Sequence, residues 1–320
     1  MTAAQPERRD SGLAVGVLLA LLSLTATGAA LEVGARVLGL ENDVLVVFTP
    51  ERCLQRSPVY GFELRPNCSR DSARWTWHTN SLGLRSAEIR ADGSVRILAL
   101  GDSNTWGWGA DQAHSYPEAL QQLLDAKYGA GRYQVINTGV PAWTSYQGAT
   151  FLRERGMALD PDIVIIAFGY NDAQRNGDDE DRLRHAVMPL VKVDDYLIGR
   201  SRFYSWVRAK MMAAGSAHEL PPRVAVEKYR RNLTDMIHRA RRGGAHVLLL
   251  SFAQPSDDQR AHLEALASAS TELGVPLVTY AGPRVDDVHP TVDGYRQLAV
   301  AVLETLERSG FVPAARAPRA

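Results

Sequence analysis

The sequence lacks the features that mark several common functional classes. It has only two cysteines, Cys53 and Cys68, and their spacing fits neither a zinc site nor a Cys-x-x-Cys redox motif. Lysine plus arginine and aspartate plus glutamate each total 36, so the formal net charge is +0 and no basic field indicates nucleic-acid binding. No glycine-rich loop followed by lysine indicates a phosphate site, and no cluster of histidine and carboxylate residues indicates a metal. We therefore expect no cofactor, no metal and no nucleic-acid partner.

A long uncharged run covers residues 11–31. About 20 apolar residues suffice to cross a bilayer as a helix, and the preceding Arg8 and Arg9 would stay on the cytoplasmic side. The helical pattern continues past the run without a break, which favours an uncleaved membrane anchor over residues 1–38. A signal peptide cleaved at the small residues 26–30 and a buried core helix are the alternatives.

Both membrane interpretations export the body of the protein. The rest of the chain would lie in the periplasm or outside the cell, either tethered by the anchor or secreted after cleavage. Because such compartments are oxidising, a disulfide between Cys53 and Cys68 is expected, with two unrelated free thiols as the alternative.

Residues 39–92 form a lead segment without long helical periodicity. The alternating stretch at 74–78, which carries two tryptophans, predicts a strand or hairpin. The turn-like stretch Asn-Ser-Leu-Gly-Leu-Arg follows at residues 80–85. We interpret this lead segment as a small β-rich cover on the main domain.

Short apolar runs alternate with amphipathic stretches over residues 93–312. The strands expected from this pattern are Arg96–Leu100, Gln134–Asn137, Ile163–Phe168, His246–Ser251 and Leu277–Tyr280, and the helices are Tyr116–Tyr128, Tyr146–Arg155, Val224–Arg242, Asp258–Leu273 and Val292–Arg308. Strands that alternate with helices predict an α/β fold with a parallel sheet. Right-handed crossovers then give a flavodoxin-like three-layer α/β/α sandwich whose five strands have the order 2-1-3-4-5.

An insertion at residues 173–223 is too long for an unstructured loop, so we expect it to contain a helix. The basic and aromatic residues at 200–211 would suit a helix at a membrane interface. An ordinary surface helix buried on one side is the alternative. Residues 313–320 are expected to be a disordered tail.

Ser103 follows the first predicted strand of the sheet in the triplet Gly101-Asp102-Ser103. In open α/β sheets the active crevice lies outside the carboxyl ends of the strands. A serine at this point can meet a base, and the N–H groups of the following helix can receive an oxyanion. Ser103 is therefore the predicted nucleophile, although a tight capped turn also explains the triplet taken alone.

His289 is the best candidate for the base that a serine nucleophile needs. It lies beyond the fifth strand, and Asp286 is close enough to accept a hydrogen bond from its ring. A helix N-terminal turn capped by the aspartate is the structural alternative. The ends of the second and third strands add Gly139 and Asn171 at the same edge of the sheet, and this convergence favours the catalytic interpretation.

These residues resemble the four sequence blocks of the SGNH/GDSL hydrolase superfamily. The blocks are Gly101-Asp102-Ser103, Gly139, Gly169-Tyr170-Asn171-Asp172 and Asp286-x-x-His289, within about residues 93–310. The stretch at 80–85 also resembles membrane-anchored bacterial members. One departure is Ala142, which stands where relatives often have a second glycine. The absence of a Gly-x-Ser-x-Gly elbow argues against the ordinary α/β-hydrolase fold.

The resemblance implies an esterase in which Ser103 is the nucleophile, His289 is the base and Asp286 orients the histidine. The oxyanion hole would consist of the N–H groups of Ser103 and Gly139 and the side chain of Asn171. Asp102 and Asp172 are interpreted as structural, bracing their turns through hydrogen bonds to the backbone.

Three tryptophans near the first two blocks, Trp106, Trp108 and Trp143, could stack on a sugar ring or line an acyl pocket. Packing beneath the loops is the alternative. The sequence thus predicts an exported serine esterase acting on a short-chain acyl ester, such as an O-acetyl group on a carbohydrate, with a glycan and the membrane as partners. An O-acyltransferase that modifies an envelope glycan and a non-catalytic glycan-binding or assembly protein remain open.

Overall fold

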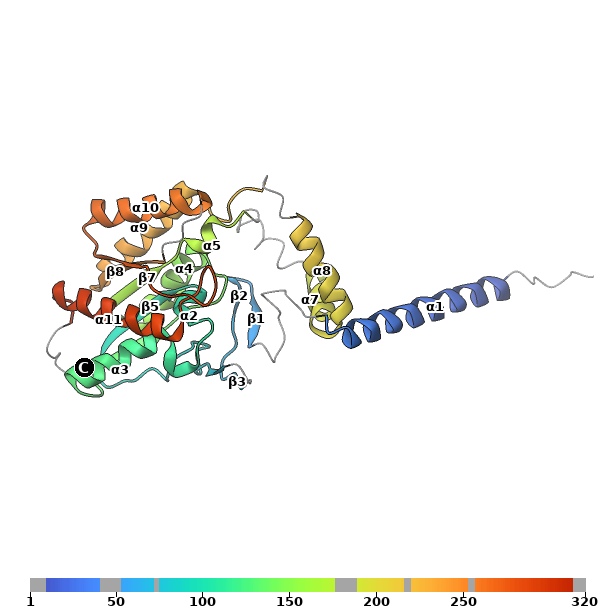
Figure 1. The fold of residues 1–320 in the computed structure, drawn as a ribbon, viewed down its shortest axis with the longest axis horizontal. Coiled ribbons are helices and arrows are strands. Elements are labelled where there is room, and N and C mark those ends of the chain that lie inside the picture. The colour runs from blue at the N-terminus through green and yellow to red at the C-terminus, as the bar shows by residue number, and fades with distance from the viewer. Residues whose placement is uncertain are drawn as a thin grey trace, which may run out of the picture. The chain divides into compact units, whose positions relative to one another are not determined.

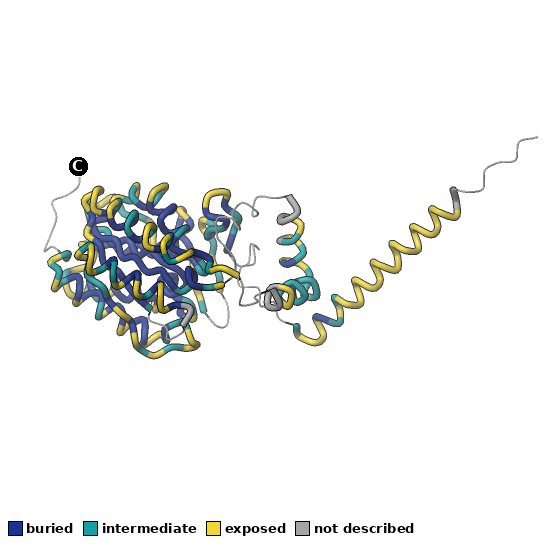
Figure 2. The backbone as a smooth tube through the Cα atoms, turned by 90° about the horizontal axis from the view of Figure 1, so that it is seen from above, coloured by how far each residue is buried: buried dark blue, intermediate teal, exposed yellow. Residues whose placement is uncertain are grey.

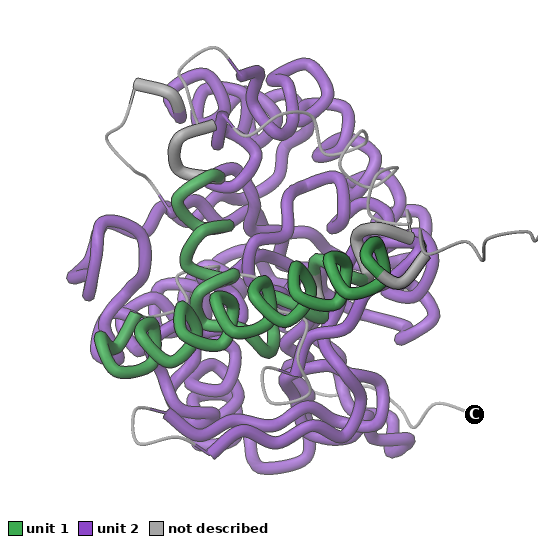
Figure 3. Tube along the Cα trace, turned by 90° about the vertical axis from the view of Figure 1, so that its right-hand side faces the viewer, with its two compact units in different colours: residues 1–47, 192–215 green, residues 48–191, 216–320 purple. Residues whose placement is uncertain are grey.

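The computed structural model of the chain describes residues 10–40, 53–71, 75–175, 189–215, 220–252 and 257–312. The predicted tail at 313–320 lies outside these ranges. The chain divides into two compact units, residues 1–47 with 192–215 and residues 48–191 with 216–320 (Figure 3). The lead segment from residue 48 onward groups with the sheet domain, whereas part of the insertion groups with the N-terminal helix.

Five parallel strands form the sheet of the larger unit (Figure 1). They are β5 (Val95–Gly101), β6 (Tyr133–Asn137), β7 (Ile163–Ala167), β8 (His246–Phe252) and β9 (Leu277–Tyr280). Their spatial order, β6-β5-β7-β8-β9, is the predicted 2-1-3-4-5 order. The central strands are buried on both faces, as the dark tube of Figure 2 shows, which is why they appear in the sequence as continuous apolar runs.

Helices cover both faces of this sheet (Figure 1). The helices and helical turns of the larger unit are α2 (Ser103–Trp106), η2 (Gln112–His114), α3 (Tyr116–Tyr128), α4 (Ser145–Phe151), η3 (Leu152–Gly156), η4 (Met157–Leu159), α5 (Tyr170–Ala173), α9 (Val226–Arg242), α10 (Asp257–Leu273) and α11 (Val292–Arg308). On one face, Leu120 of α3 and Leu298 of α11 share a core cluster with Ile97 and Ile165 of the sheet. On the other face α9 packs against β8. The predicted three-layer sandwich is confirmed.

The helix expected at 146–155 is shorter than predicted. Helix α4 ends at Phe151 and the chain continues as the π turn η3 and the 3-10 turn η4. Leu152, the first residue after α4, is fully buried like Phe151 at the end of the helix. Because apolar residues stay buried on both sides of this point, the sequence pattern does not mark where the α-helix ends.

The lead segment forms two small antiparallel pairs, as its composition predicts. Strand β1 (Leu54–Ser57) pairs with β2 (Gly61–Leu64), and β3 (Ser69–Asp71) pairs with β4 (Thr76–His78). A disulfide between Cys53 and Cys68 joins the start of the first pair to the start of the second. The disulfide considered from the sequence is therefore present.

The smaller unit contains helix α1 (Asp10–Val37) with α7 (Pro189–Arg200) and α8 (Arg202–Gly215). Residues 12–37 of α1 form a helix long and apolar enough to cross a membrane, and none of its most apolar window is buried. In this structure α1 is therefore not a buried core helix. Near the end of α1, the Glu32 carboxylate accepts hydrogen bonds from Ser201 Oγ and the backbone N–H of Arg202, so it caps the start of α8.

Candidate active site

Ser103 is presented by a one-turn helix at the carboxyl end of β5. Asp102 is the N-cap of α2, and its Oδ1 accepts the backbone N–H of Asn104 at 2.9 Å. The helix closes at Gly107, whose φ of 97° is accessible to glycine without strain and whose N–H donates to the Ser103 carbonyl. Only 8% of the Ser103 surface is exposed. The buried turn therefore holds the hydroxyl at the strand edge where the sequence predicts it.

The loop between β9 and α11 brings His289 to Ser103. The distance from His289 Nε2 to Ser103 Oγ is 2.9 Å, and His289 Nδ1 lies 2.8 Å from Asp286 Oδ2. The other carboxylate oxygen of Asp286 accepts the backbone N–H groups of Val288 and His289. Asp286 therefore caps the turn that precedes the last helix, which is the alternative interpretation of this motif. It also contacts the ring of His289. Such a chain of hydrogen bonds can activate a serine hydroxyl.

The electrostatics of this pair favour a neutral histidine. Burial lowers the pKa of His289 below its ordinary value, although the hydrogen bond to Asp286 acts in the opposite direction. Burial alone would raise the pKa of Asp286, but the hydrogen bonds from His289 and from the loop backbone bring it below its ordinary value. An ionised carboxylate only accepts hydrogen bonds, so Nδ1 carries the hydrogen and Nε2 faces Ser103 as an acceptor.

The three predicted oxyanion donors lie around the nucleophile turn and differ in whether they already have hydrogen-bond partners in the protein. The Ser103 N–H has no hydrogen-bond partner within the described ranges. The Gly139 N–H donates to Asn137 Oδ1 at 3.0 Å. Asn171 Nδ2 donates both to Asp102 Oδ2 and to the Trp143 carbonyl, at 3.2 and 3.0 Å. Two of the three donors are therefore engaged by the protein itself in this structure.

The strand-end turn at Gly139 packs directly on α2. A Cβ atom at Gly139 would lie 2.3 Å from the backbone nitrogen of Trp106, so only glycine fits. Further along the same turn, Ala142 has a φ of 66°. An alanine in this left-handed region costs about 1–2 kcal/mol relative to glycine. Ala142, which stands where relatives often have glycine, therefore keeps the backbone conformation that glycine would adopt.

The two remaining aspartates of the motifs brace the backbone. Asp102 is buried, and burial raises its pKa to about 6 although the hydrogen bonds from Asn104 act in the opposite direction. Asp172 is fully buried and accepts the backbone N–H of Ser145 at 3.0 Å. These contacts agree with the structural roles expected for both residues.

Of the three candidate tryptophans, only Trp108 has its ring stacked on His289. Trp108 is half-buried and stacks on His289, with ring centroids 5.5 Å apart. Trp106 is 3% exposed, and Trp143 is 1% exposed with its Nε1 donating to the Phe62 carbonyl. Trp143 packs under the lead segment and does not line an open surface, which corrects its assignment to a substrate wall. Trp106 likewise packs beneath the loops.

Sequence reasoning missed two residues of the lead segment near the site. Trp75 is half-buried and lies edge-on to Trp108, with ring centroids 5.1 Å apart. Arg85 is 1% exposed and lies over the ring of Trp106. The stretches that hold both residues stand out in the sequence, but nothing in their spacing indicates which loop of the main domain they contact.

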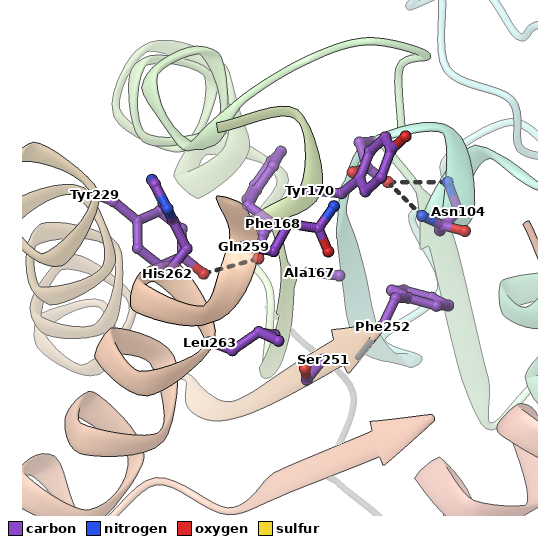
Figure 4. A pocket seen from close by; sticks show the side chains of 12 residues that line it. Asn104, Ala167, Phe168, Tyr170, Tyr229, Ser251, Phe252, Gln259, His262 and Leu263 are labelled. Atoms are coloured by element: carbon purple, nitrogen blue, oxygen red, sulfur yellow. Dashed lines mark hydrogen bonds between the residues drawn. The ribbon is translucent and has the colours of Figure 1, made fainter. Parts of the chain in front are cut away.

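A small cavity lies behind the nucleophile turn (Figure 4). It has a volume of about 20 Å³ and is lined in part by Asn104, Tyr170, Tyr229 and His262. The Tyr229 hydroxyl donates to the Phe168 carbonyl at its edge. This volume admits about one water-sized group, so the cavity is too small for an ester substrate. No group of three or more potential ligands in the described ranges is arranged to hold a metal ion.

Comparisons with known proteins agree with the geometry at the level of the family. Residues 99–297 match the model of the GDSL-like lipase/acylhydrolase family. Among solved structures, a lipase/acylhydrolase from Enterococcus faecalis has a TM-score of 0.47 and 18% identity and covers 70% of this chain and 100% of its own. A catalytic mutant of Axe2, an acetylxylan esterase from Geobacillus stearothermophilus, has a TM-score of 0.45 and 17% identity, with 71% and 100% coverage. Comparison with curated proteins gave no match. The two structural similarities do not bear on substrate.

Proposed function

The chain belongs to the GDSL-like lipase/acylhydrolase family, and from this premise we propose that it is a serine esterase that works through an acyl-enzyme on Ser103. The observation that carries the proposal is the 2.9 Å distance between Ser103 Oγ and His289 Nε2, together with the 2.8 Å contact of His289 with Asp286. The lowered pKa of His289 leaves this ring neutral and able to accept a proton at neutral pH.

The chemistry follows in two steps. Ser103 Oγ attacks the ester carbonyl carbon while His289 Nε2 takes the hydroxyl proton, and the histidine then gives this proton to the departing alcohol oxygen. In the second step His289 takes a proton from water, whose oxygen attacks the acyl-enzyme and releases the carboxylic acid. Ser103 recovers its proton from the histidine. Asp286 holds the Nδ1–H and stabilises the imidazolium that forms in each step.

The oxyanion is received first by the N–H of Ser103, which has no hydrogen-bond partner among the described residues. The amide nitrogen of Asn171 donates to Asp102 Oδ2 and to the neutral Trp143 carbonyl. A hydrogen bond to an oxyanion is charge-assisted and roughly twice as strong as a neutral one. We therefore expect the transition state to draw Asn171 Nδ2 away from that carbonyl, and the Gly139 N–H away from Asn137.

The proposed substrate is a short-chain acyl ester on a carbohydrate, reached outside the cytoplasm. The half-buried ring of Trp108 beside His289 offers a flat surface next to the reacting ester. Helix α1 would anchor the chain in the membrane. The disulfide between Cys53 and Cys68 supports an oxidising compartment for the rest of the chain.

The test is hydrolysis of p-nitrophenyl acetate by the full chain in detergent, beside Ser103→Ala. We expect the substitution to lower kcat by about 1,000-fold or more, while the control Ser309→Ala, beyond the last helix, keeps full activity. Acetylated xylo-oligosaccharides and p-nitrophenyl palmitate then separate a short carbohydrate ester from a lipid ester.

Three results would contradict the proposal. Equal turnover in Ser103→Ala would exclude the serine mechanism. Turnover that needs a glycan acceptor and releases little free acid would indicate an acyltransferase. A folded wild-type chain without turnover would indicate a binding protein.

A further inference from the structure

Arg85 of the lead segment is bound to the backbone that follows the nucleophile. Its Nη1 donates to the carbonyls of Trp106 and Gly107 at 2.8 and 3.0 Å, and its Nη2 donates to the Ala110 carbonyl at 2.7 Å. Its Nε reaches Gln112 Oε1 at 3.3 Å. The guanidinium thus holds the segment that runs from the end of α2 to the next turn.

The cation is buried without forming an ion pair. Arg85 is 1% exposed, and none of the ion pairs found among the described residues includes it. Burial lowers its pKa to about 10, which still leaves the side chain charged at neutral pH. Burying a charge is costly unless it is well hydrogen-bonded. The Nη groups of Arg85 donate to three backbone carbonyls, those of Trp106, Gly107 and Ala110. These bonds fix the course of the backbone, whereas a bond to a carboxylate would neutralise a charge.

The motif at residues 80–85 directs this side chain inward. Asn80 Oδ1 accepts the backbone N–H groups of Leu82 and Leu84 at 2.9 and 3.0 Å. Gly83 has a φ of 75°, and a Cβ there would lie 2.7 Å from the Leu64 carbonyl oxygen. The asparagine and the glycine therefore set a tight turn whose last residue is Arg85.

The carbonyl of Trp106 connects Arg85 to the oxyanion donors. This oxygen also accepts Asn137 Nδ2 at 3.3 Å, and Asn137 Oδ1 accepts the Gly139 N–H. The polar chain therefore runs from Arg85 through Trp106 and Asn137 to Gly139. The same guanidinium lies 4.2 Å from the ring centroid of Trp106, so it supports both the backbone and the side chain of this residue.

We propose that Arg85 is a positioning residue for the reaction. The lead segment would then contribute to catalysis through this side chain. By holding the carboxyl end of α2, it sets where the amide groups of Ser103 and Gly139 lie relative to the Ser103 hydroxyl. The inference rests on the proposed serine esterase function. It extends that function because the lead segment precedes the residues that match the family model.

The test compares Arg85→Gln with Arg90→Gln in the full chain, using p-nitrophenyl acetate. Arg90 is a matched control because it belongs to the same segment and also donates to backbone carbonyls, those of Gly131 and Tyr133. Those carbonyls lie at the amino end of β6, the opposite edge of the sheet. We expect Arg85→Gln to lower kcat by about 100-fold, with KM and the midpoint of the acid limb unchanged, and Arg90→Gln to leave kcat unchanged.

Two further measurements keep the test decisive if Arg85→Gln folds poorly. Arg85→Lys keeps the charge but has one nitrogen in place of the Nη1 and Nη2 groups that divide the three carbonyls between them, so its kcat should lie between those of the wild type and Arg85→Gln. In Arg85→Ala, added guanidinium ion should restore part of kcat, whereas it should restore nothing in Ser103→Ala. Partial activity in Arg85→Lys and rescue by guanidinium each support a positioning role, because general loss of structure is not repaired by the missing group.

A folded Arg85→Gln with wild-type kcat, or a loss matched by Arg90→Gln, would overturn the inference. If the wild-type chain itself has no turnover, the proposed function fails, and hydrogen exchange then decides separately whether Arg85 holds the α2 turn. The N–H groups of Trp106, Gly107 and Trp108 bond within the α2 turn. Their exchange should be about tenfold faster in Arg85→Gln than in the wild type if Arg85 holds this turn, and unchanged exchange would overturn the inference.

Discussion

The nucleophile and the base of the candidate active site are built in contrasting ways. Ser103 sits in a buried turn that is held from several sides, by Asp102, by Arg85 and by close packing against Gly139. His289 sits on a loop whose partner Asp286 has 46% of its side chain exposed. The fold fixes the proposed nucleophile and the proposed oxyanion donors through contacts between distant segments, whereas the proposed base is held mainly by bonds within its own loop.

This difference indicates on which side of the site the positions of the side chains affect the rate most. Buried donors act in a low-dielectric environment, where a charge that develops on the substrate is stabilised strongly and a small displacement is costly. Water can take over part of the role of an exposed carboxylate. Substitutions on the nucleophile side should therefore cost more activity than substitutions on the base loop, and the following predictions test this order.

Among the substitutions that leave Ser103 and His289 in place, the largest effect is expected from Asn171→Ala. Loss of one oxyanion donor should lower kcat by about 100- to 1,000-fold, with little change in KM because the interaction strengthens only in the transition state. Steady-state kinetics with p-nitrophenyl acetate measures both constants. Asn232→Ala is the control, since Asn232 donates its amide to Ser145 Oγ outside the site. A loss below about tenfold would mean that Asn171 stays bonded to the protein during the reaction.

A smaller effect is expected from Asp286→Asn. The exposed loop should limit the loss in kcat to about 10- to 100-fold, below the roughly 10,000-fold seen for a buried triad aspartate. The hydrogen bond and charge of Asp286 raise the pKa of His289, so their removal should move the acid limb of kcat/KM to lower pH. Asp287→Asn is the matched control. A shift of the limb to higher pH would contradict the assignment.

The smallest effect is expected from Ala142→Gly. Relief of the left-handed backbone at Ala142 should outweigh the added chain entropy, raising the free energy of unfolding by about 0.5–1 kcal/mol. Thermal unfolding measures this change. The control Ala267→Gly, in the middle of α10, should lower stability by about 1 kcal/mol. A destabilised Ala142→Gly would show that the alanine side chain contributes packing that offsets its strain.

The sheet and the Ser103–His289 pair were predictable because each depends on a local pattern. Apolar runs mark the strands, and polar residues at their carboxyl ends must meet at one edge. The burial of Trp143 and the contacts of Arg85 depend on how the lead segment folds onto the main domain, which no local periodicity encodes. The engagement of Asn171 by the Trp143 carbonyl likewise requires knowledge of two turns that are distant in sequence.

Labelling with a fluorophosphonate tests the central claim most directly, because this reagent forms a covalent bond only with an activated serine. Peptide mass spectrometry of the labelled full chain locates the modified residue. The account predicts a label on Ser103 that is lost in His289→Ala, although the serine is still present. A label on another residue, or on Ser103 regardless of His289, would contradict it.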